Sequence, residues 1–343
     1  MLFMQGFCFD VNRQEKNRFM MWLFGKKHKT ESAVVPLERD VVSVSAPSLI
    51  ALRHGAASLT LKPTRIRAQQ SGGYLSPFKG RGMEFEESRP YTPGDDVRSL
   101  DWRVMARSGK PHTKVFRDER ERMVLLWLDL RRPMFFATQG AYKSVRAAHA
   151  AALLGWSAIQ HGDRIGALIF SEDEHLELRP KRGKQALLHL FKRMADARVW
   201  HVDLSLPFPP PPAAALQQSL LRLRRVAQPG SLVFLLSDFG DMDEQARAHL
   251  TQLSRHCDLV LVSVYDPLEA ELPPPGRYRV SDGERVVTVD TTFDAVCQEY
   301  RQRYQRRQAE LQQFCRRHGI YLLPMSTAED PLTVLQRGLG GRL

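Results

Sequence analysis

Two aspartates stand directly after apolar, strand-sized runs of the sequence. Asp129 follows the run 123–128, and Asp238 follows the run 232–237. In a doubly wound sheet the carboxyl ends of neighbouring parallel strands gather at one edge, so we expect these two carboxylates to lie close together. Two carboxylates that lie close together repel each other, so the positive charge that balances this pair is the first chemistry to consider.

The sequence lacks the motifs of the common hydrolases and nucleotide-binding enzymes. It contains no G-x-S-x-G, no H-E-x-x-H and no G-x-x-x-x-G-K-[ST]. Gly80 and Gly82 lack the third glycine of a dinucleotide-binding fingerprint, and the eleven histidines are scattered. We therefore expect the chain not to hydrolyse ATP, assign no catalytic residue, and predict that the protein is not an enzyme.

The elements that must position the two aspartates are predicted from residue 123 onward. Strand-like apolar runs alternate there with stretches of helical periodicity, a pattern typical of a parallel sheet with helices on both faces. The predicted strands are 123–129, 164–170, 232–237, 259–265 and 320–323. The predicted helices are 141–160, 184–197, 213–226, 243–256 and 293–318. We expect a doubly wound α/β domain over 123–343, with an inserted β-hairpin near 273–290.

The sequence before residue 123 has a different character. Residues 41–122 are punctuated by glycine and proline and are predicted to form a smaller β-rich unit. Residues 1–40 combine basic side chains with an aromatic cluster at 19–24. We expect a basic, poorly ordered N-terminal segment, with contact to a membrane surface as the alternative.

A dense charged stretch closes the β-rich unit. Eleven basic and nine acidic residues lie between Lys79 and Arg122, interleaved with aromatic residues. A nucleic-acid-binding face would be mainly basic, so this balance favours a network of ion pairs and hydrogen bonds that holds loops together.

The charged stretch also carries a family resemblance. The segments 80–85, 89–101 and 106–114, continuing through 116–120, resemble the signature of the domain of unknown function 58 family. The candidate signature and interaction residues are Glu84, Arg89, Tyr91, Gly94, Asp95, Asp96, Arg98, Asp101, Trp102, Arg107, Lys114, Glu119 and Arg120. Members of this family look like von Willebrand factor A domains, are commonly encoded beside a MoxR-type AAA+ ATPase, and are presumed to act with it in maturing or remodelling other proteins.

This resemblance implies a role as a non-enzymatic interaction module or adaptor. The implied partners are a MoxR-type AAA+ ATPase and a client protein whose identity the sequence does not give. Longer members of the family carry transmembrane helices before the signature, and this chain resembles a short soluble form.

The resemblance also implies a metal site that this sequence keeps only in part. A von Willebrand A domain holds a divalent cation with Asp-x-Ser-x-Ser after the first strand, a threonine from a second loop and an aspartate after the fourth strand. Asp129 and Asp238 match the two aspartates, whereas Arg131 and Pro133 replace both serines and residues 207–212 offer no threonine. We therefore expect no cofactor, with Mg2+ as the alternative.

Arg131 suggests how such a site could persist without metal. Its guanidinium could take the place of the ion and pair with Asp129 and Asp238; alternatively, it points to solvent. If it replaces the ion, Arg131→Ala should destabilise the fold by about 1 to 3 kcal/mol, depending on burial.

Composition and charge limit the remaining function classes. The chain has 343 residues, 43% of them hydrophobic, and a formal net charge of +12. No apolar run approaches the ~18 residues of a membrane span, and four cysteines are too few for a disulfide framework. We expect a cytoplasmic protein, with a peripheral position at the inner membrane face as a variant. The basic surface, including six arginines within 301–317, leaves nucleic-acid binding as the less favoured function.

Overall fold

The structure is a computed structural model that describes residues 8–11, 40–59, 61, 83–92, 100–118, 122–201, 214–240, 242–281 and 286–339. The chain divides into two compact units. One comprises residues 1–71 together with 123–343, and the other comprises residues 72–122.

The larger unit is built on a six-stranded sheet with the order β11-β8-β7-β4-β5-β6. Its strands are β4 (Met123–Asp129), β5 (Arg164–Phe170), β6 (His175–Lys181), β7 (Leu232–Ser237), β8 (Asp258–Tyr265) and β11 (Tyr321–Ser326). Only β6 at the edge is antiparallel to its neighbour. The predicted fold class, a doubly wound and mostly parallel α/β sheet, is confirmed, and β4, β5 and β7 have the predicted bounds. The sequence analysis missed β6, whose half-exposed alternation carries Pro180 and lacks a long apolar run.

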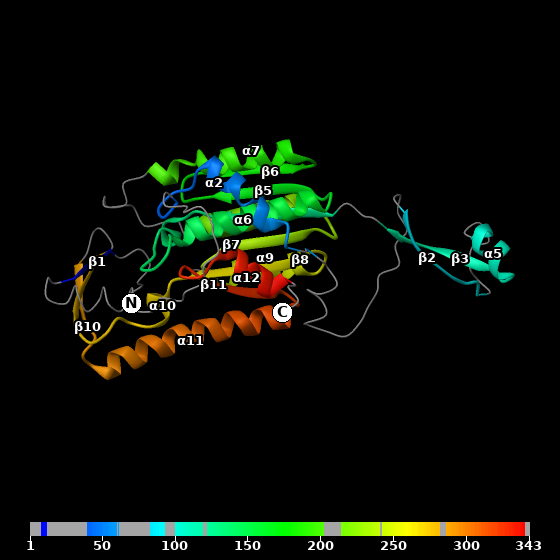
Figure 1. Cartoon of the computed structure of the whole chain (residues 1–343). Coiled ribbons are helices and arrows are strands. Elements are labelled where there is room, and N and C mark those ends of the chain that lie inside the picture. The colour runs from blue at the N-terminus through cyan, green and yellow to red at the C-terminus, as the bar shows by residue number, and fades with distance from the viewer. Residues whose placement is uncertain are drawn as a thin grey trace. The chain divides into compact units, whose positions relative to one another are not determined.

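Helices cover both faces of this sheet (Figure 1). One face packs on α2 (Ala46–Ala51), α3 (Arg53–Ala56), α6 (Lys143–Gln160), α7 (Lys184–Ala195) and α12 (Pro331–Leu339). The other packs on α8 (Ala214–Val226), α9 (Glu244–Ser254) and α11 (Asp294–Arg317). Short helical turns lie at η2 (Arg132–Met134), η3 (Arg198–His201) and α10 (Pro267–Ala270). The central strand β4 sends Leu126 into the first core and Trp127 into the second, which is why its sequence is apolar over residues 123–128.

The β-rich prediction is wrong for residues 46–61. The hydroxyl of Ser45 caps α2, with a proline in the first helical turn, so these residues begin a helix. Leu59 and Leu61 alternate as a strand would, but they are buried in the core on the α6 side of the sheet. The hydroxyl of Ser157 on α6 donates to the Leu59 carbonyl at 2.9 Å, so this segment packs on a helix instead of pairing with a strand.

The expected hairpin before the last long helix is confirmed. β9 (Arg277–Ser281) and β10 (Val286–Asp290) pair antiparallel, and β1 (Cys8–Val11) adds to the free edge of β9. These four residues of the N-terminal segment form a strand because β9 offers an open edge for backbone pairing. Residues 1–7 and 12–39 lie outside the described residues.

The smaller unit, within 72–122, is a two-stranded antiparallel hairpin with a short helix in its connection. β2 (Met83–Pro90) pairs with β3 (His112–Asp118), and α5 (Trp102–Ser108) precedes β3. The structure of these described residues therefore agrees with the prediction of a β-rich unit.

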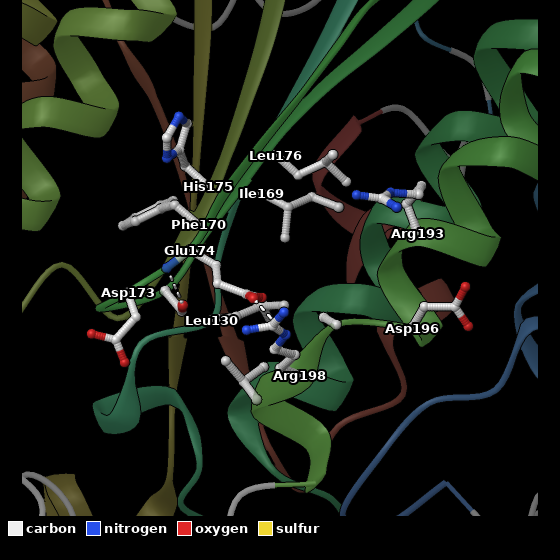
Figure 2. A pocket seen from close by; sticks show the side chains of 13 residues that line it. Leu130, Ile169, Phe170, Asp173, Glu174, His175, Leu176, Arg193, Asp196 and Arg198 are labelled. Carbon is white, nitrogen blue, oxygen red and sulfur yellow. Dashed lines mark hydrogen bonds and ion pairs between the residues drawn. The ribbon is translucent and has the colours of Figure 1, made fainter.

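A cavity of about 480 Å3 lies beside the carboxyl end of β5. The β5–β6 turn and the segment from α7 to η3 form its walls, with Leu130, Ile169 and Leu176 among its apolar lining residues (Figure 2). Glu174 and Arg198 form an ion pair of 3.0 Å there.

Candidate functional site

The structure brings Asp129 and Asp238 to the same edge of the sheet, as the sequence predicts. Asp129 is the last residue of β4, and Asp238 directly follows β7, the parallel neighbour of β4. Ser237, the last residue of β7, donates its hydroxyl to Asp129 Oδ2 at 2.7 Å and so connects the two strand ends.

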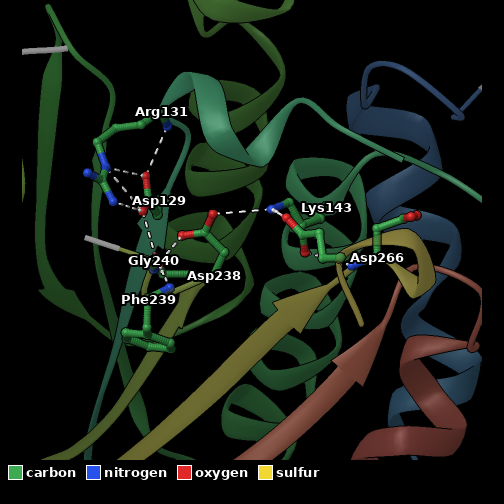
Figure 3. A network of polar contacts seen from close by, with 9 residues as sticks. Asp129, Arg131, Lys143, Asp238, Phe239, Gly240 and Asp266 are labelled. Carbon is green, nitrogen blue, oxygen red and sulfur yellow. Dashed lines mark hydrogen bonds and ion pairs between the residues drawn. The ribbon is translucent and has the colours of Figure 1, made fainter. Parts of the chain in front are cut away.

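A fully buried ion pair holds the first carboxylate (Figure 3). The side chain of Arg131 donates from Nε to Asp129 Oδ1 at 3.0 Å and from Nη2 to Oδ2 at 2.8 Å, and its backbone N–H donates to Oδ1 at 2.9 Å. Asp129 is 0% exposed and Arg131 only 3%. The guanidinium also lies 5.7 Å from the ring centroid of Phe170. The alternative in which Arg131 points to solvent is therefore wrong.

A lysine that the sequence analysis did not single out holds the second carboxylate. Lys143, at the start of α6, places its ammonium 3.2 Å from Asp238 Oδ2 and 2.7 Å from Glu269 Oε1, and it is 0% exposed. Burial alone would lower the pKa of Lys143, but the charges of Glu269 and Asp238 outweigh burial and hold that pKa above its ordinary value.

The pKa of Asp238 is shifted in the complementary direction. Burial alone would raise this pKa, but the positive charges of Lys143 and Arg131 outweigh burial and hold the pKa below its ordinary value of 3.8. The Gly240 N–H also donates to Asp238 Oδ1, at 3.1 Å. Of the two aspartates, Arg131 forms its ion pair with Asp129, and it acts on Asp238 through its charge.

A third buried aspartate ties further loops to this edge. Asp266 caps α10 and accepts hydrogen bonds from the hydroxyls of Thr138 at 2.6 Å and Thr327 at 2.7 Å. Glu269 accepts from the Asp266 backbone N–H at 2.9 Å, so the residue that pairs with Lys143 also completes the α10 cap. The loops after β4, β8 and β11 are therefore joined through buried polar groups.

The turn after β7 is held in a backbone conformation that is uncommon for a side chain of its size. Phe239 has φ 51°, in the left-handed region, while its side chain is buried among the residues of the second core. Its N–H donates to the Ser237 hydroxyl at 3.1 Å. The same hydroxyl therefore bonds Asp129 and fixes the turn that carries Asp238.

The donor set does not fit a divalent cation. Each aspartate of the pair already has a buried cation beside it, and Pro133, also buried, has no side-chain donor. Across the described ranges, no group of three or more His, Cys, Asp or Glu side chains is arranged to hold a metal ion. A hard cation needs several oxygen ligands that are free to turn toward it, and here the oxygens face Arg131 and Lys143 instead.

The residues that the sequence analysis missed are Lys143, Ser237, Asp266 and Glu269. Lys143 opens an alanine-rich helix, and a lysine at a helix start is ordinarily exposed. The Pro267-Leu268-Glu269 run after Asp266 is a helix-start signal, but nothing in the sequence connects it with residue 143.

The signature residues belong to the unit 72–122, whereas Asp129 and Asp238 belong to the other unit. Glu84 and Arg89 are on β2, Lys114 is on β3, Trp102 and Arg107 are on α5, and Tyr91 and Asp101 lie in the connection. Gly94, Asp95, Asp96, Arg98, Glu119 and Arg120 lie outside the described residues. The Tyr91 N–H donates to the Pro111 carbonyl at 3.0 Å, which closes the base of the connection that carries α5.

The fold and the site together define a doubly wound α/β domain whose acidic strand ends are neutralised by internal cations. The chain belongs to the family described as Protein of unknown function DUF58, whose model matches residues 87–313. It is 28% identical over 275 residues to Uncharacterized protein Rv1480 of Mycobacterium tuberculosis and to Uncharacterized protein Mb1516 of Mycobacterium bovis, with 79% of this chain and 83% of each relative covered.

One solved structure also aligns with the chain. It is the crystal structure of conserved hypothetical protein BatB from Bacteroides thetaiotaomicron, at a TM-score of 0.40 and 14% identity, covering 64% of this chain and 97% of that one. Within the part of the chain that the structure describes, none of the helices is both long and apolar enough to cross a membrane.

Proposed function

We propose that this protein is a non-enzymatic interaction module that works with a MoxR-type AAA+ ATPase in maturing or remodelling client proteins. The observation that carries the proposal is the mutual neutralisation at the sheet edge, where Asp129 pairs with Arg131 and Lys143 pairs with Asp238 and Glu269. A general base or nucleophile needs an ionisable group that can reach a substrate. These buried groups are paired with one another and do not reach a substrate, which supports a binding role over a catalytic one.

The same network supports a rigid binding surface. Buried ion pairs and the Asp266 hydrogen bonds fix the loops after β4, β7, β8 and β11 at one edge of the sheet. A site whose supporting side chains are locked by hydrogen bonds presents a constant shape to a partner. The choice of an AAA+ ATPase as that partner comes from the family resemblance.

The proposal is tested by mixing the purified chain with the purified MoxR-type ATPase of the same organism. Calorimetric titration should give a saturable complex, and the rate of ATP hydrolysis should change when the chain is added. The chain alone should hydrolyse no ATP. Absence of a complex at about 100 µM of each protein, a concentration that detects even weak association, would overturn the proposal.

Nucleic-acid binding is the second candidate because the arginines of α11 face solvent. Arg306, Arg316 and Arg317 are exposed, whereas Arg301 pairs with Glu271 at 2.8 Å. An electrophoretic mobility shift with generic duplex DNA and single-stranded RNA tests this candidate. Tight, salt-sensitive binding would favour it over the adaptor role.

A further inference from the structure

The helix α5 is capped at both ends and is bonded to its hairpin at its start. Asp101, only 6% exposed, accepts from the N–H groups of Arg103 at 3.1 Å and Val104 at 3.3 Å, and so caps the helix. The Asp101 N–H donates to the His112 carbonyl of β3 at 2.8 Å, and Gly109 ends the helix at φ 66°. These contacts hold the seven-residue helix in a defined position on β3.

This helix presents a tryptophan to solvent. Trp102 is 63% exposed, the highest value among the exposed large hydrophobic residues of the described chain. It makes no ring contact and no side-chain hydrogen bond with any described residue. Ala106, one turn later and also exposed, is too small to cover the indole. The ring is thus displayed without a role in the packing of its own unit.

Three basic residues accompany the tryptophan on this segment. Arg103 and Arg107 stand one turn apart on the face next to Trp102, and Lys110 follows the helix end. All three are exposed, and none forms an ion pair with a residue that the structure describes. The acidic residue of this segment, Asp101, is buried and used as the helix cap. The α5 surface, defined here as Trp102, Arg103, Arg107 and Lys110, therefore combines one large aromatic ring with three positive charges that have no ion-pair partner among the described residues.

We infer that this α5 surface docks an acidic segment of a partner protein that offers an apolar pocket to Trp102. The inference rests on the proposed interaction role and identifies its surface. Tryptophan and arginine are the residues most enriched at the energetic centres of protein interfaces, and charge complementarity specifies an acidic partner.

Other anionic partners fit the α5 surface less well. Stable attachment to anionic lipid takes clusters of about 4–8 basic residues, more than the three present on this segment. Single-stranded nucleic acid is held by several stacking aromatic side chains along a basic groove, whereas α5 offers one.

The test uses the full chain and the purified MoxR-type ATPase of the same organism, titrated at two salt concentrations. Trp102→Ala should weaken the complex at least about 10-fold, and Trp102→Phe should recover part of the loss. The double change Arg103→Glu with Arg107→Glu should weaken the complex more at low salt than at high salt, because high salt already screens the charge attraction in the parent complex. Matched controls are Phe293→Ala, a residue 62% exposed, and Arg225→Glu with Arg255→Glu, which should change the affinity less than about 2-fold.

Each outcome separates the two proposals. An unchanged melting temperature shows that Trp102→Ala is folded. If this variant binds the ATPase as well as the parent does, the assignment of docking to the α5 surface is wrong, whereas the proposed adaptor role is unaffected. Absence of any complex with the parent chain overturns both. The parent is also titrated with vesicles containing phosphatidylserine and with duplex DNA. If the parent binds the vesicles or the DNA and Trp102→Ala abolishes that binding, the α5 surface binds that ligand. The inference that it docks an acidic protein segment would then be wrong.

Discussion

Removing the guanidinium beside Asp129 should destabilise the fold more than any surface change of the same charge. Arg131→Ala deletes the two-point contact to Asp129 and the contact with the Phe170 ring, while Asp129 stays 0% exposed. Only the Ser237 hydroxyl and the backbone N–H of residue 131 would remain as its donors.

The burial of the pair sets the magnitude. Breaking a buried ion pair by deleting one partner costs about 3–5 kcal/mol, because an uncompensated charge is left in the interior. The structure therefore places the effect above the range of about 1 to 3 kcal/mol that follows from the sequence alone. The pair of Arg198 and Glu174 is the matched control, since its side chains are 86% and 43% exposed. Arg198→Ala should cost less than about 1 kcal/mol.

The assay is urea unfolding of the full chain, followed by far-ultraviolet circular dichroism with and without magnesium. Asp129→Asn with Arg131→Met should recover much of the loss, because neither partner then leaves a buried charge. Magnesium should not restore the stability of Arg131→Ala, since Lys143 still forms an ion pair with Asp238. A loss no larger than that of Arg198→Ala, or full recovery with magnesium, would refute the reasoning.

Three further results are expected at the same edge of the sheet. The melting temperature of the parent should be the same in magnesium and in chelator. A magnesium-dependent rise would show that the carboxylates of Asp129 and Asp238 can bind the metal in place of Arg131 and Lys143. Lys143→Ala should cost about 3–5 kcal/mol by unfolding titration, and Asp238→Asn added to it should recover part of that loss; no recovery would show that charge is not the cause. The pKa of Asp238 is lowered in the fold, so the unfolded chain takes up the proton first as the pH falls. Its stabilisation should be complete above its ordinary pKa of 3.8 and be lost as the pH falls below that value, and a parent and Asp238→Asn pair with identical acid unfolding would contradict this.

Much of the larger unit could be predicted from local patterns. The interiors of β4, β5 and β7 are continuous apolar runs because both faces of a central parallel strand are buried, so the ends of these strands could be read from the sequence. The meeting of Asp129 and Asp238 followed from the same patterns, since each directly follows such a run. The edge strand β6 and the segment 46–61 were missed or misassigned, because their patterns depend on what they pack against.

The chemistry of the site was decided by the tertiary structure. The sequence has Arg131 and Pro133 at the positions where the family resemblance implies serine ligands, and we therefore expected no complete metal site. It did not show which charge would balance Asp238, because Lys143 and Glu269 are 95 and 31 residues away from Asp238 along the chain, by subtraction of their numbers.

The sequence by itself therefore determined the fold class, the strand ends and the meeting of Asp129 and Asp238, all of which depend on neighbouring residues. The tertiary structure decided that two cations are buried, that each holds particular carboxylates, and that Trp102 is exposed. Burial and pairing of charges depend on which segments the sheet order brings together. That information lies in long-range packing, because a lysine at a helix start or an aromatic residue in a charged stretch has the same local pattern whether it is buried or displayed.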